Sequence, residues 1–204
     1  MELEKLEAIL ASDYKGPRAG FTEAHVLKAL LTIGSSTNVG RGKLGALLDL
    51  GQGEVRTLIK RLKEARLITV EERGCLLTQS GKREWSRIKK LIPWSFEVDG
   101  KSLGLGDFCW IVNVRGKSDR IRNGLEQRDA SVKAGARGAL TVVYSSGKFK
   151  VPPDVSDSEA TAPSELWTTI RSWGVNEGDA LIISGSNDLL SAEYGALSAA
   201  LSIL

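Results

Sequence analysis

The strongest constraint on the fold is a change of apolar period in the first half of the chain. Residues 51–66, GQGEVRTLIKRLKEAR, place their apolar side chains within about 80° of Val55 on a helical wheel, with basic side chains opposite. Residues 68–77 then follow the pattern of two short strands around the turn ERG. We therefore expect an amphipathic helix that leads directly into a β-hairpin.

Helical patterns flank this unit on both sides. Residues 21–33 have helical spacing with Thr22 as a candidate N-cap, and residues 41–50 form a second short helical pattern. Thr78 precedes a further helix, which Pro93 ends. The expected order is therefore three helices, a hairpin and a last helix.

Two stretches of this region carry a resemblance. LGALLDLGQGEVRTLIKRLKEARLI resembles the second helix, turn and third helix of the winged helix-turn-helix superfamily, and CLLTQSGKR resembles the exit from its wing. The resemblance implies a winged helix-turn-helix DNA-binding domain over residues 1–92, with an extra helix at its N-terminus. One departure is Arg66, which stands where many members have a glycine that ends the third helix in the left-handed conformation.

Charge is unevenly placed along the 204 residues, whose net charge is only +3. Residues 1–92 hold 17 basic against 11 acidic residues, or +6, and residues 93–204 hold 11 against 14, or −3. Residues 41–90 alone hold 13 against 6, or +7. A basic module joined to a mildly acidic one is consistent with a nucleic-acid partner for the first half.

The third helix is the element expected to enter the DNA major groove. Its first residues would lie nearest the base edges, where arginine can contact guanine and glutamine can contact adenine. Lysines and arginines around it suit the phosphates, and Arg73 at the hairpin tip suits the minor groove. The expected DNA-binding residues are Arg41, Lys43, Gln52, Arg56, Thr57, Lys60, Arg61, Lys63 and Arg73.

The second half alternates strand and helix patterns. FCWIVNV and DALIIS are apolar runs of strand length, and SDRIRNGLEQRDASVKAGA is helical in pattern, with Ser118 as its cap. This alternation predicts a small α/β domain over residues 93–204 with a mostly parallel sheet, in a chain that is α+β overall. Residues 95–106 are expected to form an edge hairpin or a connector.

A charged residue interrupts the apolar stripe of that helix. On the wheel, Arg128 lies between Leu125 and Val132. A buried charge must be paired or hydrogen-bonded, so Arg128 either forms a structural ion pair or holds an anionic ligand. The strand-to-helix junctions RGKS and SGSN favour a ligand, because α/β sheets bind ligands beyond the ends of their strands. The candidate ligand-binding residues are Arg115, Lys117, Ser118, Arg128, Asp129, Ser186 and Asn187.

Other classes of function find little support in the sequence. The single histidine, His25, lies far from Cys75 and Cys109, so we expect no metal site and no cofactor. No nucleophile and base lie together in a catalytic motif, so we do not expect an enzyme. No run of about 20 apolar residues would span a bilayer and no secretion signal begins the chain, which predicts a cytoplasmic protein.

Over nearly its full length the chain resembles a family of uncharacterised archaeal proteins, through NGLEQRDASVKAGARGA and GDALIIS…AEYGALSAAL. We expect a transcriptional regulator that binds double-stranded DNA as a homodimer and senses a small anionic effector, or self-associates, through its second domain. An amphipathic segment over residues 1–14 either joins two copies or docks on its own core. The alternatives are an adaptor that binds protein or RNA, and an enzyme with a DNA-binding appendage.

Overall fold

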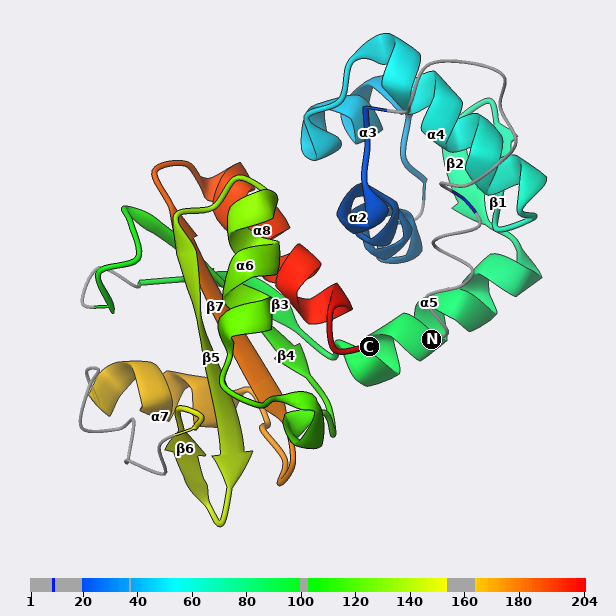
Figure 1. Ribbon diagram of the computed structural model, residues 1–204. Coiled ribbons are helices and arrows are strands. Elements are labelled where there is room, and N and C mark those ends of the chain that lie inside the picture. The colour runs from blue at the N-terminus through cyan, green and yellow to red at the C-terminus, as the bar shows by residue number, and fades with distance from the viewer. Residues whose placement is uncertain (1–8, 10–19, 37, 100–102, 154–163) are drawn as a thin grey trace. The chain divides into compact units, whose positions relative to one another are not determined.

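The computed structural model describes residue 9 and residues 20–36, 38–99, 103–153 and 164–204 (Figure 1). Of the predicted N-terminal helix, only Ile9 falls among these residues. The chain divides into two compact units, Met1–Ile88 and Lys89–Leu204, and the division falls within a helix. No helix in the described ranges has the length and apolar character needed to cross a bilayer.

The first unit consists of helices around one short hairpin (Figure 1). Its elements, in chain order, are α2 (Glu23–Gly34), α3 (Arg41–Leu48), α4 (Gln52–Glu64), β1 (Ile68–Glu71), β2 (Gly74–Leu77) and α5 (Gln79–Leu91). The two strands are antiparallel. This order and these bounds follow the apolar periods of the sequence, since residues such as Leu27, Leu44 and Leu62 are buried. Helix α5 differs, because the residues that it buries are Gly81, Glu84 and Ile88.

Caps and turns begin and end these helices as the sequence indicates. The backbone N–H of Thr22 donates to Nδ1 of His25 at 3.1 Å at the start of α2. The backbone N–H of Gly81 donates to the hydroxyl of Thr78 at 3.0 Å at the start of α5. Arg66 adopts the left-handed conformation, with φ of 57°, so that an arginine ends α4 where glycine has the lower steric cost.

The second unit is built on a five-stranded sheet. Its strands are β3 (Ser95–Val98), β4 (Phe108–Val114), β5 (Gly138–Ser145), β6 (Lys148–Lys150) and β7 (Ala180–Ser186). Their spatial order is β3-β4-β7-β5-β6. Every pair of neighbours is antiparallel, so the expected mostly parallel sheet is wrong.

The position of β7 explains this error. The segment from β4 through a helix to β5 gives two strands of the same direction, as a strand–helix–strand pattern suggests. However, β7 lies between them and runs antiparallel to both. Strand order depends on contacts between segments distant in sequence, which the local patterns do not contain. The chain remains a mixed α and β protein, with an antiparallel sheet domain after a mainly helical one.

Helices cover both faces of this sheet (Figure 1). One face carries α6 (Leu125–Lys133) and α8 (Leu189–Leu201), and the other carries α7 (Ser164–Ser172). Under α7 the core includes Trp167, Ile170 and Phe149. Under α8 the close approach depends on Gly195, where a Cβ atom would lie 2.3 Å from Oγ of Ser184.

The helix predicted to begin at Ser118 begins later and faces the other way. Residues Ser118–Arg120 form a short 3-10 helix, and α6 starts only at Leu125 after Gly124 in the left-handed conformation. The side of α6 that faces the protein buries Gln127 and Ser131. The apolar stripe that was expected inside is therefore exposed, because small and polar residues allow α6 to lie close to α8 and the sheet.

Candidate nucleic-acid interface

A concave surface of about 350 Å³ lies between α4, the start of α3 and the β1–β2 hairpin. Three arginines reach it from three different elements: Arg41 from α3, Arg56 from α4 and Arg73 from the hairpin turn. We call this surface the arginine groove. Its lining residues are Gly40, Arg41, Arg56, Ile59, Val70, Glu71, Glu72, Arg73, Gly74 and Cys75.

The backbone around Gly74 holds the hairpin against the start of α3. Val39 and Cys75 exchange two backbone hydrogen bonds, with N···O distances of 2.8 and 3.3 Å. Gly74 has a φ of 131°, and a Cβ atom there would lie 2.6 Å from the carbonyl of Val39. Only glycine fits this approach, which places Arg73 and Arg41 on the same surface.

The three groove arginines are exposed. Within the described ranges, their guanidinium groups take part in no ion pair and donate no hydrogen bond to another side chain or to the backbone. Glu71 and Glu72 also line the groove and reduce its net positive charge. A groove with free guanidinium groups suits an extended anionic ligand, since each arginine can contact a phosphate or a base edge.

Other predicted DNA-binding residues lie at the margins of the groove. Gln52, Lys43 and Lys63 are exposed, and Gln52 is the first residue of α4. The hydroxyl of Thr57 donates to the carbonyl of Gly53 at 2.9 Å. Lys60 lies 3.9 Å from Glu64 on the same helix, an exposed pair of small energetic weight.

Arg61 was expected at the DNA, and the structure places it elsewhere. Its side chain is buried, its Nη1 donates to the carbonyl of Ile9 at 3.2 Å, and its guanidinium lies 5.3 Å from the centre of the Phe21 ring. The helical wheel contained the signal, because Arg61 lies only about 40° from the apolar Ala65. Arg61 therefore belongs to the packing of the first unit.

The candidate ligand residues of the second unit do not converge. Residues 115–118 follow β4, and residues 186–187 follow β7. Because these strands are antiparallel, with Phe108 opposite Ser186 and Val114 opposite Ala180, the two junctions lie at opposite ends of the sheet. Arg115, Lys117 and Ser118 therefore cannot share one site with Ser186 and Asn187.

Internal hydrogen bonds account for much of this polarity. Asp179 is fully buried and accepts hydrogen bonds from Gly116 N at 2.9 Å, Asn176 N at 3.0 Å and Asn113 Nδ2 at 3.1 Å. It thereby fixes the loop after β4, a role that the sequence does not reveal. At the other end, Arg137 donates to the side-chain oxygen of Asn187 at 3.0 Å.

From the sequence, Arg128 was expected either to form an ion pair or to hold an anionic ligand. Arg128 Nη2 lies 3.0 Å from Asp129 Oδ1, so the ion-pair reading is confirmed. The pair is not buried, since the two side chains are 53% and 57% exposed. Arg128 is therefore exposed to solvent and is not the buried charge that the helical wheel predicted.

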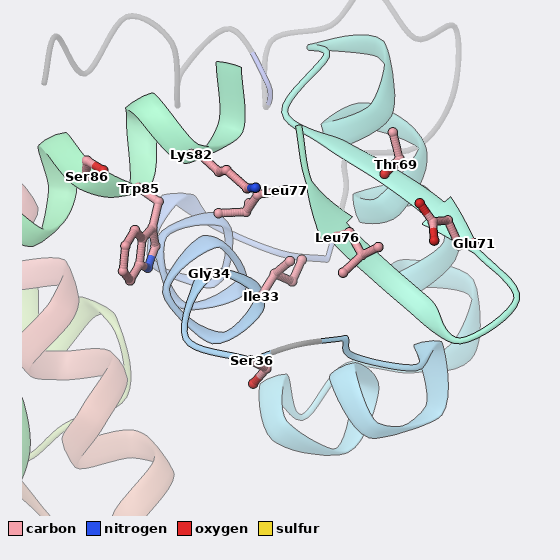
Figure 2. Close-up of a pocket in the computed structure, with 10 residues that line it drawn as sticks. All are labelled: Ile33, Gly34, Ser36, Thr69, Glu71, Leu76, Leu77, Lys82, Trp85 and Ser86. Carbon is pink, nitrogen blue, oxygen red and sulfur yellow. The ribbon is translucent and has the colours of Figure 1, made fainter. Parts of the chain in front are cut away.

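A larger pocket, of about 510 Å³, lies in the first unit on another side of the hairpin (Figure 2). Its wall includes Ile33 and Gly34 at the end of α2, Leu77 on β2, and Lys82 and Trp85 on α5. Gly34 admits the Trp85 ring, because a Cβ atom there would lie 2.1 Å from Trp85 Cδ1. The remaining lining residues are Ser36, Thr69, Glu71, Leu76 and Ser86.

The titratable groups offer little for covalent catalysis or metal binding. Burial raises the pKa of the Cys75 thiol, and burial together with Asp99 raises the pKa of Cys109. Both thiols are therefore weak nucleophiles near neutral pH. Within the part of the chain that the structure describes, no three His, Cys, Asp or Glu side chains lie close enough together to hold a metal ion.

Two family models match this chain. Residues 28–83 match the PH0730-like N-terminal domain, and residues 105–203 match a domain of unknown function, DUF4443. Among solved structures, the hypothetical protein PH0730 from Pyrococcus horikoshii OT3 is similar, with a TM-score of 0.73 and 23% identity. The match covers 90% of this chain and 92% of that one. No curated protein matches.

Each half therefore matches a different family model, and the fold over both halves is similar to that of a hypothetical protein from Pyrococcus horikoshii. At 23% identity, the likeness to PH0730 concerns the fold alone. The descriptions of the two family models contain no activity, so the function must be argued from the geometry of the site.

Proposed function

We propose that the first unit binds double-stranded DNA through the arginine groove and that the protein is a homodimeric transcriptional regulator. The observation that carries this proposal is the convergence of Arg41, Arg56 and Arg73, all exposed, on one surface. Three basic side chains against two acidic ones, Glu71 and Glu72, leave the groove with a net positive charge, which attracts an anionic ligand.

The order of elements supports the same proposal. Three helices, a hairpin and a helix is the order of winged helix-turn-helix domains, in which the helix before the hairpin enters the major groove. On this assignment α4 is the recognition helix, with Gln52 and Arg56 near base edges, and Arg73 at the hairpin turn meets the adjacent backbone or minor groove. Arg41, Lys43, Lys60 and Lys63 neutralise phosphates.

The test is binding of a fluorescent random-sequence duplex, measured by anisotropy over a series of salt concentrations. We expect Arg41→Ala, Arg56→Ala and Arg73→Ala combined to lose about 3 kcal/mol, roughly a hundredfold in affinity, and to flatten the salt dependence. The matched control replaces three exposed arginines outside the groove, Arg83, Arg120 and Arg122, by alanine. It removes the same charge and should retain most of the affinity.

The two variants separate this function from the main alternative. Equal losses in both would indicate attraction by net charge alone. If the groove variant bound duplex as the wild type does, the proposal would be wrong, and a protein- or RNA-binding adaptor would replace it.

We further propose that the pocket of Figure 2 holds the effector of the regulator. Its volume lies within the usual range of ligand sites, about 300–1,000 Å³, and its wall combines apolar side chains with the exposed amine of Lys82. Glu71 disfavours a second negative charge on the ligand. The class that fits is a monocarboxylate with an apolar body.

Strand β1 gives such a ligand a route to the DNA-binding surface. Thr69 and Glu71 line the pocket, while Val70, Glu71 and Glu72 line the arginine groove. A ligand that shifts the hairpin would therefore move Arg73. Calorimetric titration with aromatic monocarboxylates, their amides and matched dicarboxylates tests this, and Lys82→Ala should abolish the preference for the monocarboxylates. If the amides bound as tightly as the monocarboxylates, the proposed carboxylate site would be wrong.

A further inference from the structure

Helix α6 presents apolar side chains to solvent. Among the described residues, five large apolar side chains are exposed, and two of them, Leu125 at 47% and Val132 at 48%, belong to this nine-residue helix. The exposed ion pair of Arg128 and Asp129 lies between them in sequence. The opposite side of this helix is already packed against the protein, so these side chains remain available to a partner.

These four residues form one stripe along the helix. Leu125, Arg128, Asp129 and Val132 are spaced i, i+3, i+4 and i+7, which places them within an arc of about 100°. This is the spacing of the contact seam between two packed helices. The buried residues Gln127 and Ser131 lie on the opposite side, where α6 meets its own unit. We call the four exposed residues the α6 stripe.

The α6 stripe is complementary to a reversed copy of itself. If a twofold axis passes midway between Arg128 and Asp129, antiparallel packing places Leu125 opposite Val132 of a second copy. The same axis places Arg128 opposite Asp129 of that copy, and the converse pairs follow by symmetry. A parallel arrangement would instead place like charges opposite each other. The pattern of apolar and charged residues therefore favours a second copy of the same helix, packed in the antiparallel orientation.

We propose that two copies of this chain associate through antiparallel packing of their α6 stripes. Two apolar contacts stabilise the dimer. Arg128 and Asp129, which pair within each chain, each face the opposite charge of the other copy, and this arrangement sets the register. The partner is a second copy because a single surface supplies both halves of every contact. The inference does not rest on DNA binding, since it uses only residues of the second unit.

The length of the helix bounds the strength of this association. Stable interfaces bury about 800 Å² on each partner, which is more than one short helix supplies. We therefore expect a dissociation constant in the micromolar range that rises with salt, because the ion pairs are exposed to solvent.

Sedimentation velocity of the full chain over a range of concentrations tests the proposal. Arg128→Asp places acidic residues opposite one another, and Asp129→Arg does the same with basic residues, so each variant alone should be monomeric. Their equimolar mixture should associate, because every contact between the two variants is again between opposite charges. The double variant Arg128→Asp with Asp129→Arg should also dimerise. Arg120→Asp, an exposed charge reversal outside the stripe, should leave association unchanged.

Each outcome of these experiments either supports the dimer or contradicts it. A monomeric wild-type chain across this range, or dimers that persist in both single variants, would overturn the proposal. Recovery in the mixture shows that the single variants are folded. Oxidation of Leu125→Cys mixed with Val132→Cys then tests direction, since antiparallel packing predicts a mixed disulfide and little Leu125→Cys self-linkage. The native Cys75 and Cys109 are buried and do not compete.

Discussion

At the scale of single residues, Gly195 controls how closely α8 lies against the sheet. A Cβ atom there would lie 2.3 Å from Ser184 Oγ, 2.6 Å from Ala136 Cβ and 2.7 Å from Ser131 Oγ. These neighbours belong to β7, to the loop before β5 and to α6, so a helix must move to make room for the added methyl group. We predict that Gly195→Ala lowers the free energy of unfolding by about 1–3 kcal/mol, measured by urea denaturation.

The control is a glycine of a helix with free space around it. At Gly42 in α3, no atom lies within 4 Å of an added Cβ. Gly42→Ala should therefore stabilise the protein by roughly 0.5–1 kcal/mol, through the lower conformational entropy of the unfolded chain. Destabilisation of the same size in both variants would show that helix geometry, and not packing against Ser184, is responsible.

Two residues of α4 separate base reading from phosphate binding. Arg56 lines the arginine groove, whereas Lys63 is exposed near the end of the helix. We predict that Arg56→Ala lowers affinity by about 1–3 kcal/mol and relaxes the preference at one base position. Lys63→Ala should weaken binding to all sequences alike. Selection of bound sequences from a random pool, with each variant, distinguishes the two, and an unchanged base preference in Arg56→Ala would contradict its assigned role.

At the scale of elements, the N-terminus of α2 has a pH-sensitive cap. His25 Nδ1 accepts a hydrogen bond from the backbone N–H of Thr22 and lies 2.9 Å from the Thr22 hydroxyl. Burial lowers the pKa of His25 below 6.5, and Lys28 lowers it further. The unfolded chain therefore takes up this proton first as the pH falls. The free energy of unfolding should be highest above about pH 6.5 and should decrease as the pH falls below that value. It should stop decreasing below the pKa that His25 has in the folded protein.

This prediction has a conservative control because His25 is the only histidine. Glutamine at this position can accept the same backbone hydrogen bond without titrating. His25→Gln should therefore flatten the dependence of stability on pH between about pH 5 and pH 8. Denaturation curves across this range are the measurement, and an unchanged slope in the variant would assign the effect to carboxylates.

The elements also show what a sequence can predict. The helices and hairpin of the first unit follow from local periods of apolar residues. Arg41, Arg56 and Arg73 were expected at a common surface because the order of elements resembles a winged helix-turn-helix domain. The direction of the sheet was missed because the insertion of β7 between β4 and β5 is a long-range choice. The α6 stripe was placed inside because apolar periodicity does not distinguish a protein core from an interface.

At the scale of the whole molecule, DNA binding and self-association make one joint prediction. Two DNA-binding units linked through the α6 stripe would engage two half-sites at once, which multiplies affinity by a factor of about 10² or more when the geometry permits it. Arg128→Asp should therefore weaken binding to a duplex that carries two selected half-sites, and leave binding to a single half-site unchanged. The double variant Arg128→Asp with Asp129→Arg should restore the two-site affinity.

The pattern of results shows whether the assumption about DNA contact or the assumption about dimerisation is wrong. An equal loss on one-site and two-site duplexes would mean that Arg128 acts on the fold or contacts DNA itself, so that the dimer is not the cause. Unchanged two-site binding in Arg128→Asp, with self-association abolished in solution, would mean that the units bind DNA independently. Full recovery in the double variant, with Arg56→Ala still defective on both duplexes, would place DNA contact in the first unit and pairing in the second.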